Sequence, residues 1–178
     1  MKDLLEKTSN QNKEDLKKSI KNDVLYYTGL LAVIAAIILF NKFVFYFPVV
    51  GGISMENTLY DGQRMGCARI HNPNEIERFD IVTASWGDVQ IVKRVIGMPG
   101  DTILIDNQGI IYLNGEVLKE NYGKEPILDG GIAKEGVTLK EGEYFLLGDN
   151  RNNSDDSRFH VGIVKFEQLL GKMVTVFE

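Results

Sequence analysis

The sequence predicts a mainly β fold, in which an N-terminal transmembrane helix precedes a curled antiparallel β-sheet or barrel-like domain. The first observation is a single long apolar segment, residues 24–40, which contains no charged side chain. The second is the series of short β-branched and aromatic runs after residue 48, separated by turns rich in Gly, Asn and Asp. The third is the length of 178 residues, which leaves room for one domain in addition to an anchor.

The apolar segment is long enough to cross a membrane. With its continuation to Phe47 it reaches about 24 residues, and a helix of about 20 residues crosses the hydrocarbon core. A buried core helix is the alternative, but a helix that is apolar on every side has no other place to be buried in a small β-rich chain. A cleavable signal peptide would need small residues after the apolar run, where Tyr46, Phe47 and Pro48 stand. We therefore expect a retained anchor.

This pattern divides the chain into a Lys-rich tail (residues 1–23), a transmembrane anchor with an apolar apron (24–47) and a β-rich domain (48–178). The tail contains six lysines, whereas only Lys42 follows closely on the other side of the apolar segment. The positive-inside rule then predicts a single-pass protein of the cell membrane, with a cytoplasmic N-terminus and an extracytoplasmic domain. The apron either lies in the interfacial region of the lipid bilayer or packs on the sheet; its residues are Phe43, Phe45, Tyr46, Phe47, Val49 and Val50.

The expected strands are short runs bounded by turn residues. Asn114-Gly115 predicts a two-residue hairpin between 110–113 and 116–118. A helical turn is expected at 166–170, before a closing strand at 173–177. The other expected strands are 79–84, 91–96, 102–105 and 144–147.

Composition excludes several functional classes. The net charge of −5 and the lack of a basic stripe argue against a nucleic-acid partner. The single cysteine, Cys67, excludes an internal disulfide and a cysteine-cluster metal site. A calcium loop beginning at Asp149 would place Arg151 at position 3 and His160 at position 12, where calcium loops need oxygen ligands. No metal or cofactor is therefore expected.

Lys93 is the first candidate for chemistry. In the strand expected around it, Lys93 shares a face with Val89, Ile91 and Val95, because side chains alternate between faces. Desolvation by such neighbours lowers the pKa of a lysine and makes the neutral amine available as a base. The alternative is an edge-strand lysine whose ammonium stays in water.

Ser54 is the second candidate. Its hydroxyl follows Gly51-Gly52, whose flexible backbone suits the presentation of amide groups to an oxyanion, although serines after glycines are also common in ordinary turns. A serine nucleophile needs a neighbouring base. Neither His71 nor His160 has a sequence context that places it beside a serine, which leaves Lys93 as the remaining candidate base.

Four segments carry a resemblance to a known family. Residues 54–59 are similar to the motif S-M-x-P-T-L, and residues 78–82 to R-G-D-I-V. Residues 93–101 match K-R-V-I-G-x-P-G-D, and residues 148–158 match G-D-N-R-x-x-S-x-D-S-R. With these motifs in family order after one anchor, the chain resembles the bacterial type I signal peptidases, membrane-anchored Ser-Lys proteases that cleave signal peptides from exported proteins.

The resemblance implies a role for each matching residue. Ser54 would attack the scissile carbonyl and donate its backbone N–H to the oxyanion, and Lys93 would act as the general base. Ser154 would orient the Lys93 amine. The remaining residues would support this site: Asp156 and Arg158 as an ion pair holding their loop, Arg94 and Asp149 as structural groups, and Gly52 where some members carry an additional serine hydroxyl.

The resemblance also implies the substrate and leaves two alternatives. The substrates would be secretory precursors with signal peptides, bound as an added strand, and the reaction would need no cofactor. A non-catalytic assembly factor or chaperone for exported subunits is the first alternative: Asn57 in place of the family proline is the only feature in its favour, and the intact Ser54 and Lys93 argue against it. A self-cleaving repressor-type Ser-Lys protease would need a DNA-binding domain, where residues 1–47 provide an anchor instead.

Overall fold

The computed structural model describes residues 1–177, with the side chains of residues 1, 13, 16–40 and 43–177. The chain divides into two compact units, Met1–Val44 and Phe45–Glu178. The first unit is the single helix α1 (Lys2–Val44). The second unit contains the strands.

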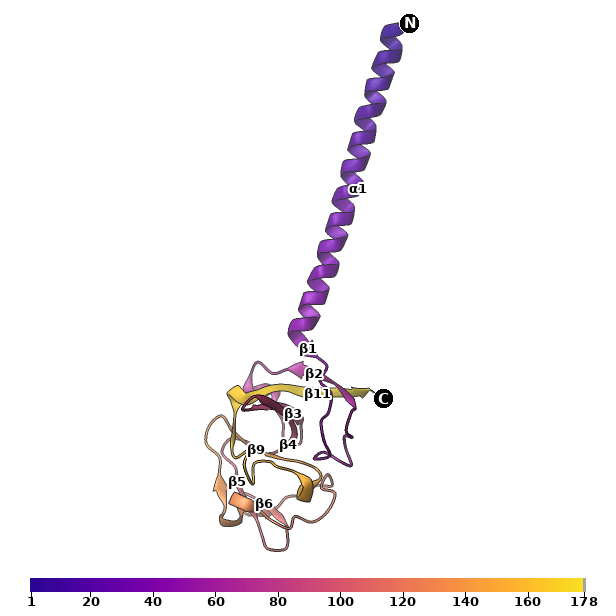
Figure 1. The fold of residues 1–178 in the computed structure, drawn as a ribbon. Helices are drawn as coiled ribbons and strands as arrows, with labels where there is room; N and C mark the ends of the chain where they lie inside the picture. The colour runs from indigo at the N-terminus through magenta and orange to yellow at the C-terminus, as the bar shows by residue number, and fades with distance from the viewer. Residues whose placement is uncertain (178) are drawn as a thin grey trace. The chain divides into compact units, whose positions relative to one another are not determined.

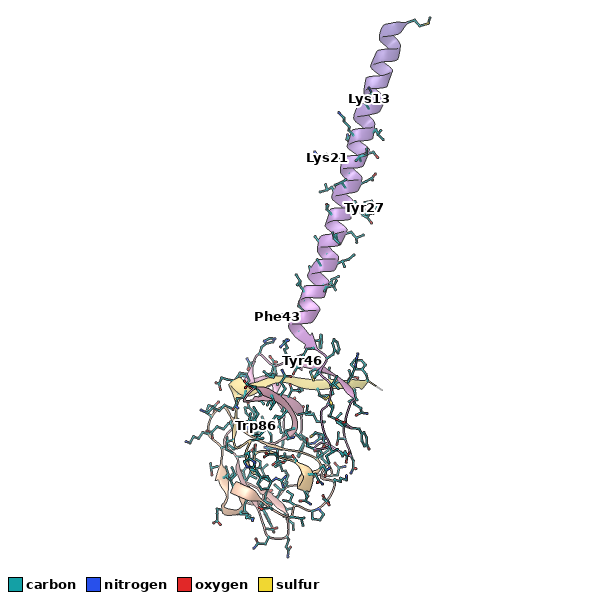
Figure 2. The ribbon with its side chains drawn as sticks, viewed as in Figure 1. Lys13, Lys21, Tyr27, Phe43, Tyr46 and Trp86 are labelled. Carbon is teal, nitrogen blue, oxygen red and sulfur yellow. The ribbon has the colours of Figure 1, made fainter. Side chains whose placement is uncertain are left out.

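Helix α1 contains a stretch, Leu16–Phe40, that is long and apolar enough to cross a membrane, and none of it is buried. Figure 2 shows Lys21 and Tyr27 projecting outward from this helix. The helix covers the predicted tail and most of the predicted anchor. Phe45–Tyr46 forms the first strand, so the last residues assigned to the anchor from the sequence belong to the second unit.

The second unit contains two antiparallel sheets (Figure 1). In order across the larger sheet, its strands are β1 (Phe45–Tyr46), β2 (Arg64–Arg69), β11 (Leu169–Phe177), β3 (Ile81–Trp86), β4 (Val89–Gly97), β9 (Glu143–Leu147) and β10 (Val164–Lys165). The smaller sheet contains β7 (Glu116–Val117), β6 (Ile111–Leu113), β5 (Thr102–Ile105) and β8 (Val137–Thr138). Four 3₁₀ helices connect strands: η1 (Pro73–Glu75), η2 (Gly131–Glu135), η3 (Arg151–Asn153) and η4 (Phe166–Gln168).

The predicted fold class is confirmed: an apolar N-terminal helix precedes curled antiparallel sheets, which do not close into a barrel. The Asn114-Gly115 turn lies between β6 and β7 with φ values of 54° and 85°, which are the left-handed values that such a hairpin turn requires. The strand predicted from Phe79 begins at Ile81, because Phe79 has a φ of 74° and cannot continue a strand.

Several strands were not predicted. β1, β8 and β10 have two residues each, which is too short for a recognisable periodicity. β2 has the sequence Arg-Met-Gly-Cys-Ala-Arg, which lacks the β-branched and aromatic residues that identify strands. It is nevertheless an interior strand, next to the edge strand β1, because it pairs with both β1 and β11.

The core of the second unit comprises three groups of buried apolar side chains. One lies around β4, β5 and β9 and includes Ile96, Ile103 and Phe145. A second includes Val82, Val95 and Leu146, from the sheet face that also carries Lys93. The third lies beneath the Ser54 segment; its buried members are Val50, Met55, Leu59, Met65, Cys67 and Ile81.

Candidate active site

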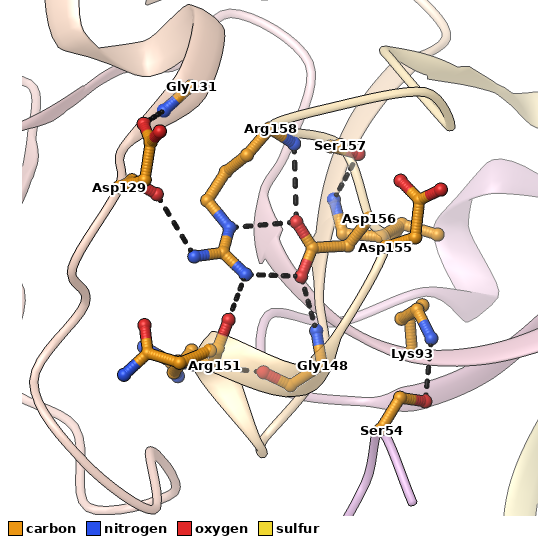
Figure 3. Close-up of polar contacts among 12 residues, drawn as sticks. Ser54, Lys93, Asp129, Gly131, Gly148, Arg151, Asp155, Asp156, Ser157 and Arg158 are labelled. Atoms are coloured by element: carbon orange, nitrogen blue, oxygen red, sulfur yellow. Dashed lines mark hydrogen bonds and ion pairs between the residues drawn. The ribbon is translucent and has the colours of Figure 1, made fainter. Parts of the chain in front are cut away.

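Lys93 and Ser54 lie side by side (Figure 3). The Lys93 Nζ donates a hydrogen bond to the Ser54 Oγ across 2.8 Å, although 39 positions separate the two residues in the chain. Lys93 belongs to the central strand β4, and Ser54 to the turn segment between β1 and β2. A rigid sheet therefore fixes one partner, and a loop presents the other.

Lys93 is almost completely removed from water, with 4% of its surface exposed. Its antiparallel neighbour in β3 is Val82, which has no exposed surface, and Val95 lies next on the same face of β4. Burial lowers the pKa of Lys93, and the nearby Asp156 and Asp155 carboxylates oppose this effect. Desolvation is the largest cause, so the environment favours the neutral amine relative to a lysine in water.

Backbone hydrogen bonds close the turn that carries Ser54. The N–H groups of Thr58 and Leu59 donate to the Met55 carbonyl at 2.8 and 2.9 Å. Met55 and Leu59 are buried in the core below, which fixes the turn from beneath. Asn57, which stands where the family has proline, is exposed on this turn.

Gly52 precedes Ser54 in a left-handed conformation, with a φ of 83°. Its N–H donates to the Asp61 Oδ1 at 2.7 Å, and a Cβ added here would enter open space. The Gly52 N–H therefore stabilises the loop through its hydrogen bond to Asp61.

Arg94 connects the lysine strand to the serine turn. Its Nε and Nη2 donate to the two carboxylate oxygens of Asp149 at 2.9 and 2.6 Å, with both side chains buried. Its Nη1 donates to the Phe79 carbonyl at 2.8 Å. The Thr58 hydroxyl, from the serine turn, donates to the same Asp149 carboxylate. This buried bidentate pair thus joins β4, the serine turn and the segment after β9.

Asp156 and Arg158 form a second buried bidentate pair. The Arg158 Nε and Nη2 donate to the two Asp156 oxygens, each at 2.8 Å. Asp156 also accepts the Gly148 N–H at 3.1 Å, and Arg158 donates to the carbonyls of Arg151 and Asp129 (Figure 3). The pair closes the loop of residues 148–158 on itself.

Ser154 lies in this loop beside the dyad. It is buried, and among the described residues its hydroxyl has no hydrogen-bond partner. A Cβ added at Gly148 would lie 2.2 Å from the Ser154 Oγ and 2.5 Å from the Ser54 carbonyl oxygen. Both serines therefore pack closely against Gly148. The hydrogen bond from Ser154 to the Lys93 amine stays a prediction.

Asn150 was not predicted from the sequence as a site residue. Its N–H donates to the Ser54 carbonyl at 3.0 Å, and its side-chain amide donates to the Ile53 carbonyl, also at 3.0 Å. The loop of residues 148–158 therefore fixes the nucleophile's own backbone. The match of this loop to the family motif was the only feature of the sequence that pointed to Asn150, and it did not indicate which residues Asn150 contacts.

A cleft of about 190 Å³ opens beside the dyad. Ser54 and Lys93 line it together with Thr83 from β3 and with neighbouring residues of β4 and the segment after β1: Pro48, Val49, Gly51, Gln90, Ile91 and Val92.

The histidines lie elsewhere. The His160 Nδ1 contacts the Asp155 carboxylate at 2.9 Å on the surface, and the His71 N–H donates to Glu75 near η1. Neither ring is among the residues that line the cleft beside Ser54. In the part of the chain searched for metal ligands, no group of three or more His, Cys, Asp or Glu side chains could hold a metal ion.

Comparison with known proteins assigns the chain to a family. A family model described as "Signal peptidase, peptidase S26" matches residues 23–178. A Signal peptidase I of Bacillus amyloliquefaciens is 34% identical over 94% of this chain and 93% of that protein. A Signal peptidase I of Bacillus caldolyticus is 40% identical over 74% of this chain and 78% of that protein. A crystal structure of a signal peptidase I from Enterococcus faecalis V583 has 34% identity and a TM-score of 0.47, covering 56% of this chain and 97% of that chain. The chain therefore belongs to the signal peptidase family, peptidase S26.

Proposed function

We propose that this protein is a serine endopeptidase that removes N-terminal signal peptides from exported proteins, with Ser54 as nucleophile and Lys93 as general base. The observation that carries the proposal is the 2.8 Å contact between the Nζ of the buried Lys93 and the Oγ of the half-buried Ser54. Membership of the signal peptidase family supports the reaction class. The alternative of a non-catalytic assembly factor is not favoured, since the relatives are named as peptidases.

The first half of the reaction is acylation. The Ser54 Oγ attacks the scissile carbonyl carbon while its proton passes to the neutral Lys93 amine. Negative charge develops on the carbonyl oxygen, where the Ser54 N–H donates a hydrogen bond. The C–N bond then breaks, the Lys93 ammonium gives its proton to the leaving amine, and an ester on Ser54 remains.

Deacylation repeats the proton transfers with water. The neutral Lys93 amine takes a proton from the attacking water, and the tetrahedral intermediate collapses when the ester C–O bond breaks. Lys93 returns the proton to the Ser54 Oγ, and the signal-peptide carboxylate leaves. Because burial lowers the pKa of Lys93, the amine is available as a base at a lower pH than an exposed lysine.

The site suits an extended substrate with small side chains. The cleft of about 190 Å³ lies along β4, where a peptide could add to the sheet by backbone hydrogen bonds. We expect a cleft of this limited volume to favour small side chains beside the reacting carbonyl. The substrates are then secretory precursors in extended conformation.

Supporting roles follow for the residues around the dyad. Ser154 orients the Lys93 amine, and the Asp156–Arg158 and Arg94–Asp149 pairs hold the loop and the serine turn. Gly52 has no side-chain hydroxyl, so the oxyanion is stabilised by the backbone N–H of Ser54. Each is a positioning role except that of Ser154, whose hydroxyl would touch the base.

Helix α1 would anchor the protein in the bilayer, with its Lys-rich N-terminal residues in the cytoplasm and residues from about 48 outside. This orientation places the proposed site where exported precursors emerge. Epitope tags at the two ends, tested for protease protection in spheroplasts, distinguish the orientation; a protected C-terminal tag would overturn it.

Cleavage of a synthetic signal-peptide substrate by the full chain in detergent tests the dyad. Ser54→Ala and Lys93→Met should each abolish cleavage, while circular dichroism shows the wild-type fold. Ser85→Ala in β3 and Lys140→Met on the surface serve as matched controls, and both should retain wild-type rates. Cleavage by either dyad variant at a rate near that of the wild type would disprove the assignment.

A further inference from the structure

The segment of residues 119–129, here called the strap, contacts three segments around the proposed site: the loop of residues 148–158, the serine turn and β4. It follows β7 and precedes η2, and it forms no strand or helix of its own. The resemblance assigned nothing to it. Its contacts nevertheless fall on the segments that carry the reaction.

The strap is fastened to the loop of residues 148–158 along its length. The Glu120 carboxylate pairs with the Arg151 guanidinium at 2.6 Å, with both side chains largely buried. The Lys124 N–H donates to the Asp149 carbonyl at 2.8 Å. The Asn152 side chain donates to the Pro126 carbonyl at 2.9 Å. A mobile surface loop would not combine a buried ion pair with these backbone contacts.

The strap also contacts the serine turn and the lysine strand. The Lys124 Nζ lies 3.0 Å from the Glu56 Oε2, two residues after Ser54. The ring of Tyr122 covers the Arg94 guanidinium, whose Cζ lies 3.7 Å from the ring centroid. Tyr122 also packs against the Phe79 ring at 5.3 Å.

Tyr122 completes the surroundings of Arg94. The edge of the guanidinium is occupied by Asp149 and by the Phe79 carbonyl, and the Tyr122 ring covers its face. A cation over an aromatic face is stabilised most when water is excluded, and the Arg94 side chain is 5% exposed. The ring therefore holds in place the ion pair that joins Thr58 of the serine turn to the residue next to Lys93.

We propose that Tyr122 is a positioning residue for the signal-peptidase reaction, acting through Arg94 and Asp149 on the separation of Ser54 and Lys93. The proposal rests on the dyad proposed above. The aromatic face, and not the phenol hydroxyl, carries the role, because the contact to Arg94 is made by the ring. Tyr122 is not among the groups that shift the pKa of Lys93, so its role is to set the geometry of the dyad and not the charge of the base.

The test compares Tyr122→Leu, Tyr122→Met and Tyr122→Phe in the full chain, with single-turnover cleavage of a synthetic signal peptide. Leu and Met remove the aromatic face, and we expect the rate of the chemical step to fall about tenfold with KM unchanged. Phe keeps the face and should restore the wild-type rate. The acidic limb of the pH–rate profile should stay at its wild-type position in all variants, which a change in the pKa of Lys93 would not allow.

Asn121→Ala is the matched control, because Asn121 is an exposed neighbour on the same strap. It should cleave at the wild-type rate. Wild-type rates in Tyr122→Met, or a loss in Tyr122→Phe equal to that in Tyr122→Met, would overturn the proposal. If only one of the Tyr122→Leu and Tyr122→Met variants folds, the cleavage rate of the folded variant decides between these outcomes. A Ser54→Ala sample run in parallel separates the two proposals: activity there would reject the dyad, whereas an inactive sample leaves any failure with Tyr122.

Discussion

Gly148→Ala tests whether the loop of residues 148–158 fixes the position of the nucleophile. Gly148 is the point where this loop meets both serines, because its Cα faces the Ser54 carbonyl and the Ser154 hydroxyl. An added Cβ would lie 2.5 Å from the Ser54 carbonyl oxygen and 2.2 Å from the Ser154 Oγ. The Ser154 hydroxyl can rotate away, but the Ser154 Cβ, 2.6 Å from the added Cβ, and the Ser54 carbonyl oxygen can move only if the backbone shifts.

The magnitude follows from that distance. To reach an ordinary contact of 3.4 Å, the Ser54 carbonyl and the added methyl must separate by about 0.9 Å. The same carbonyl accepts the Asn150 N–H at 3.0 Å, so the shift also strains this hydrogen bond. A displacement of about 1 Å at reacting groups costs about 100-fold in rate. We therefore expect Gly148→Ala to lower kcat about 100-fold.

The assay is cleavage of a synthetic signal peptide by purified full-length protein, with thermal unfolding measured on the same samples. Gly97→Ala is the matched control, because its Cβ would lie 2.6 Å from Ile103 and 2.8 Å from Leu139, in the core and away from the serines. The control should lose stability while its folded fraction keeps the wild-type kcat. If Gly148→Ala cleaves within about threefold of the wild-type rate, the loop does not fix Ser54, and the reasoning is wrong.

Asp156, Lys93 and the thiol of Cys67 are buried groups whose burial can be tested. Asp156→Asn leaves the buried Arg158 without a charged partner, so the free energy of unfolding in urea should fall by about 3 kcal/mol, and an unchanged value would contradict the role of this pair. Burial lowers the pKa of Lys93, so the unfolded chain binds more protons between that lowered value and 10.5, and stability rises with pH in this window. Lys93→Met should therefore have a higher Tm than the wild type at pH 7, with the difference shrinking as pH approaches 10.5; an equal Tm at pH 7 would show that the amine is not desolvated. Burial raises the pKa of the Cys67 thiol to about 11, so the native protein should not react with a disulfide reagent at pH 8 and should react once unfolded in guanidinium, and rapid native labelling would contradict its burial.

Local sequence patterns predicted what depends on local structure. The alternation around Lys93 predicted a strand that buries the amine, and β4 has that course. The Asn114-Gly115 pair predicted its hairpin because a turn with two left-handed residues strongly prefers these residue types. The helix was predictable because an uncharged apolar run of this length is rare outside membranes.

Contacts between distant segments could not be predicted from spacing. The pairing of β11 with both β2 and β3 places the end of the chain inside the larger sheet, and no local pattern encodes this order. Tyr122 lies in an irregular segment 28 positions after Arg94, and nothing in its sequence context identifies it as the residue that covers the guanidinium. Asn150 was visible as a motif residue, but its partners, the carbonyls of Ile53 and Ser54, come from a segment almost 100 positions earlier.

The charge state of Lys93 depends both on its local strand neighbours and on contacts with a distant segment of the chain. Burial lowers its pKa; of the three same-face neighbours predicted from the sequence, Val95 is buried and Ile91 is half-buried, whereas Val89 is 53% exposed at the start of β4. The opposing effect comes from Asp155 and Asp156, in the loop that also brings Ser154 to the site. The segment proposed to orient the amine therefore also limits how far its pKa can fall.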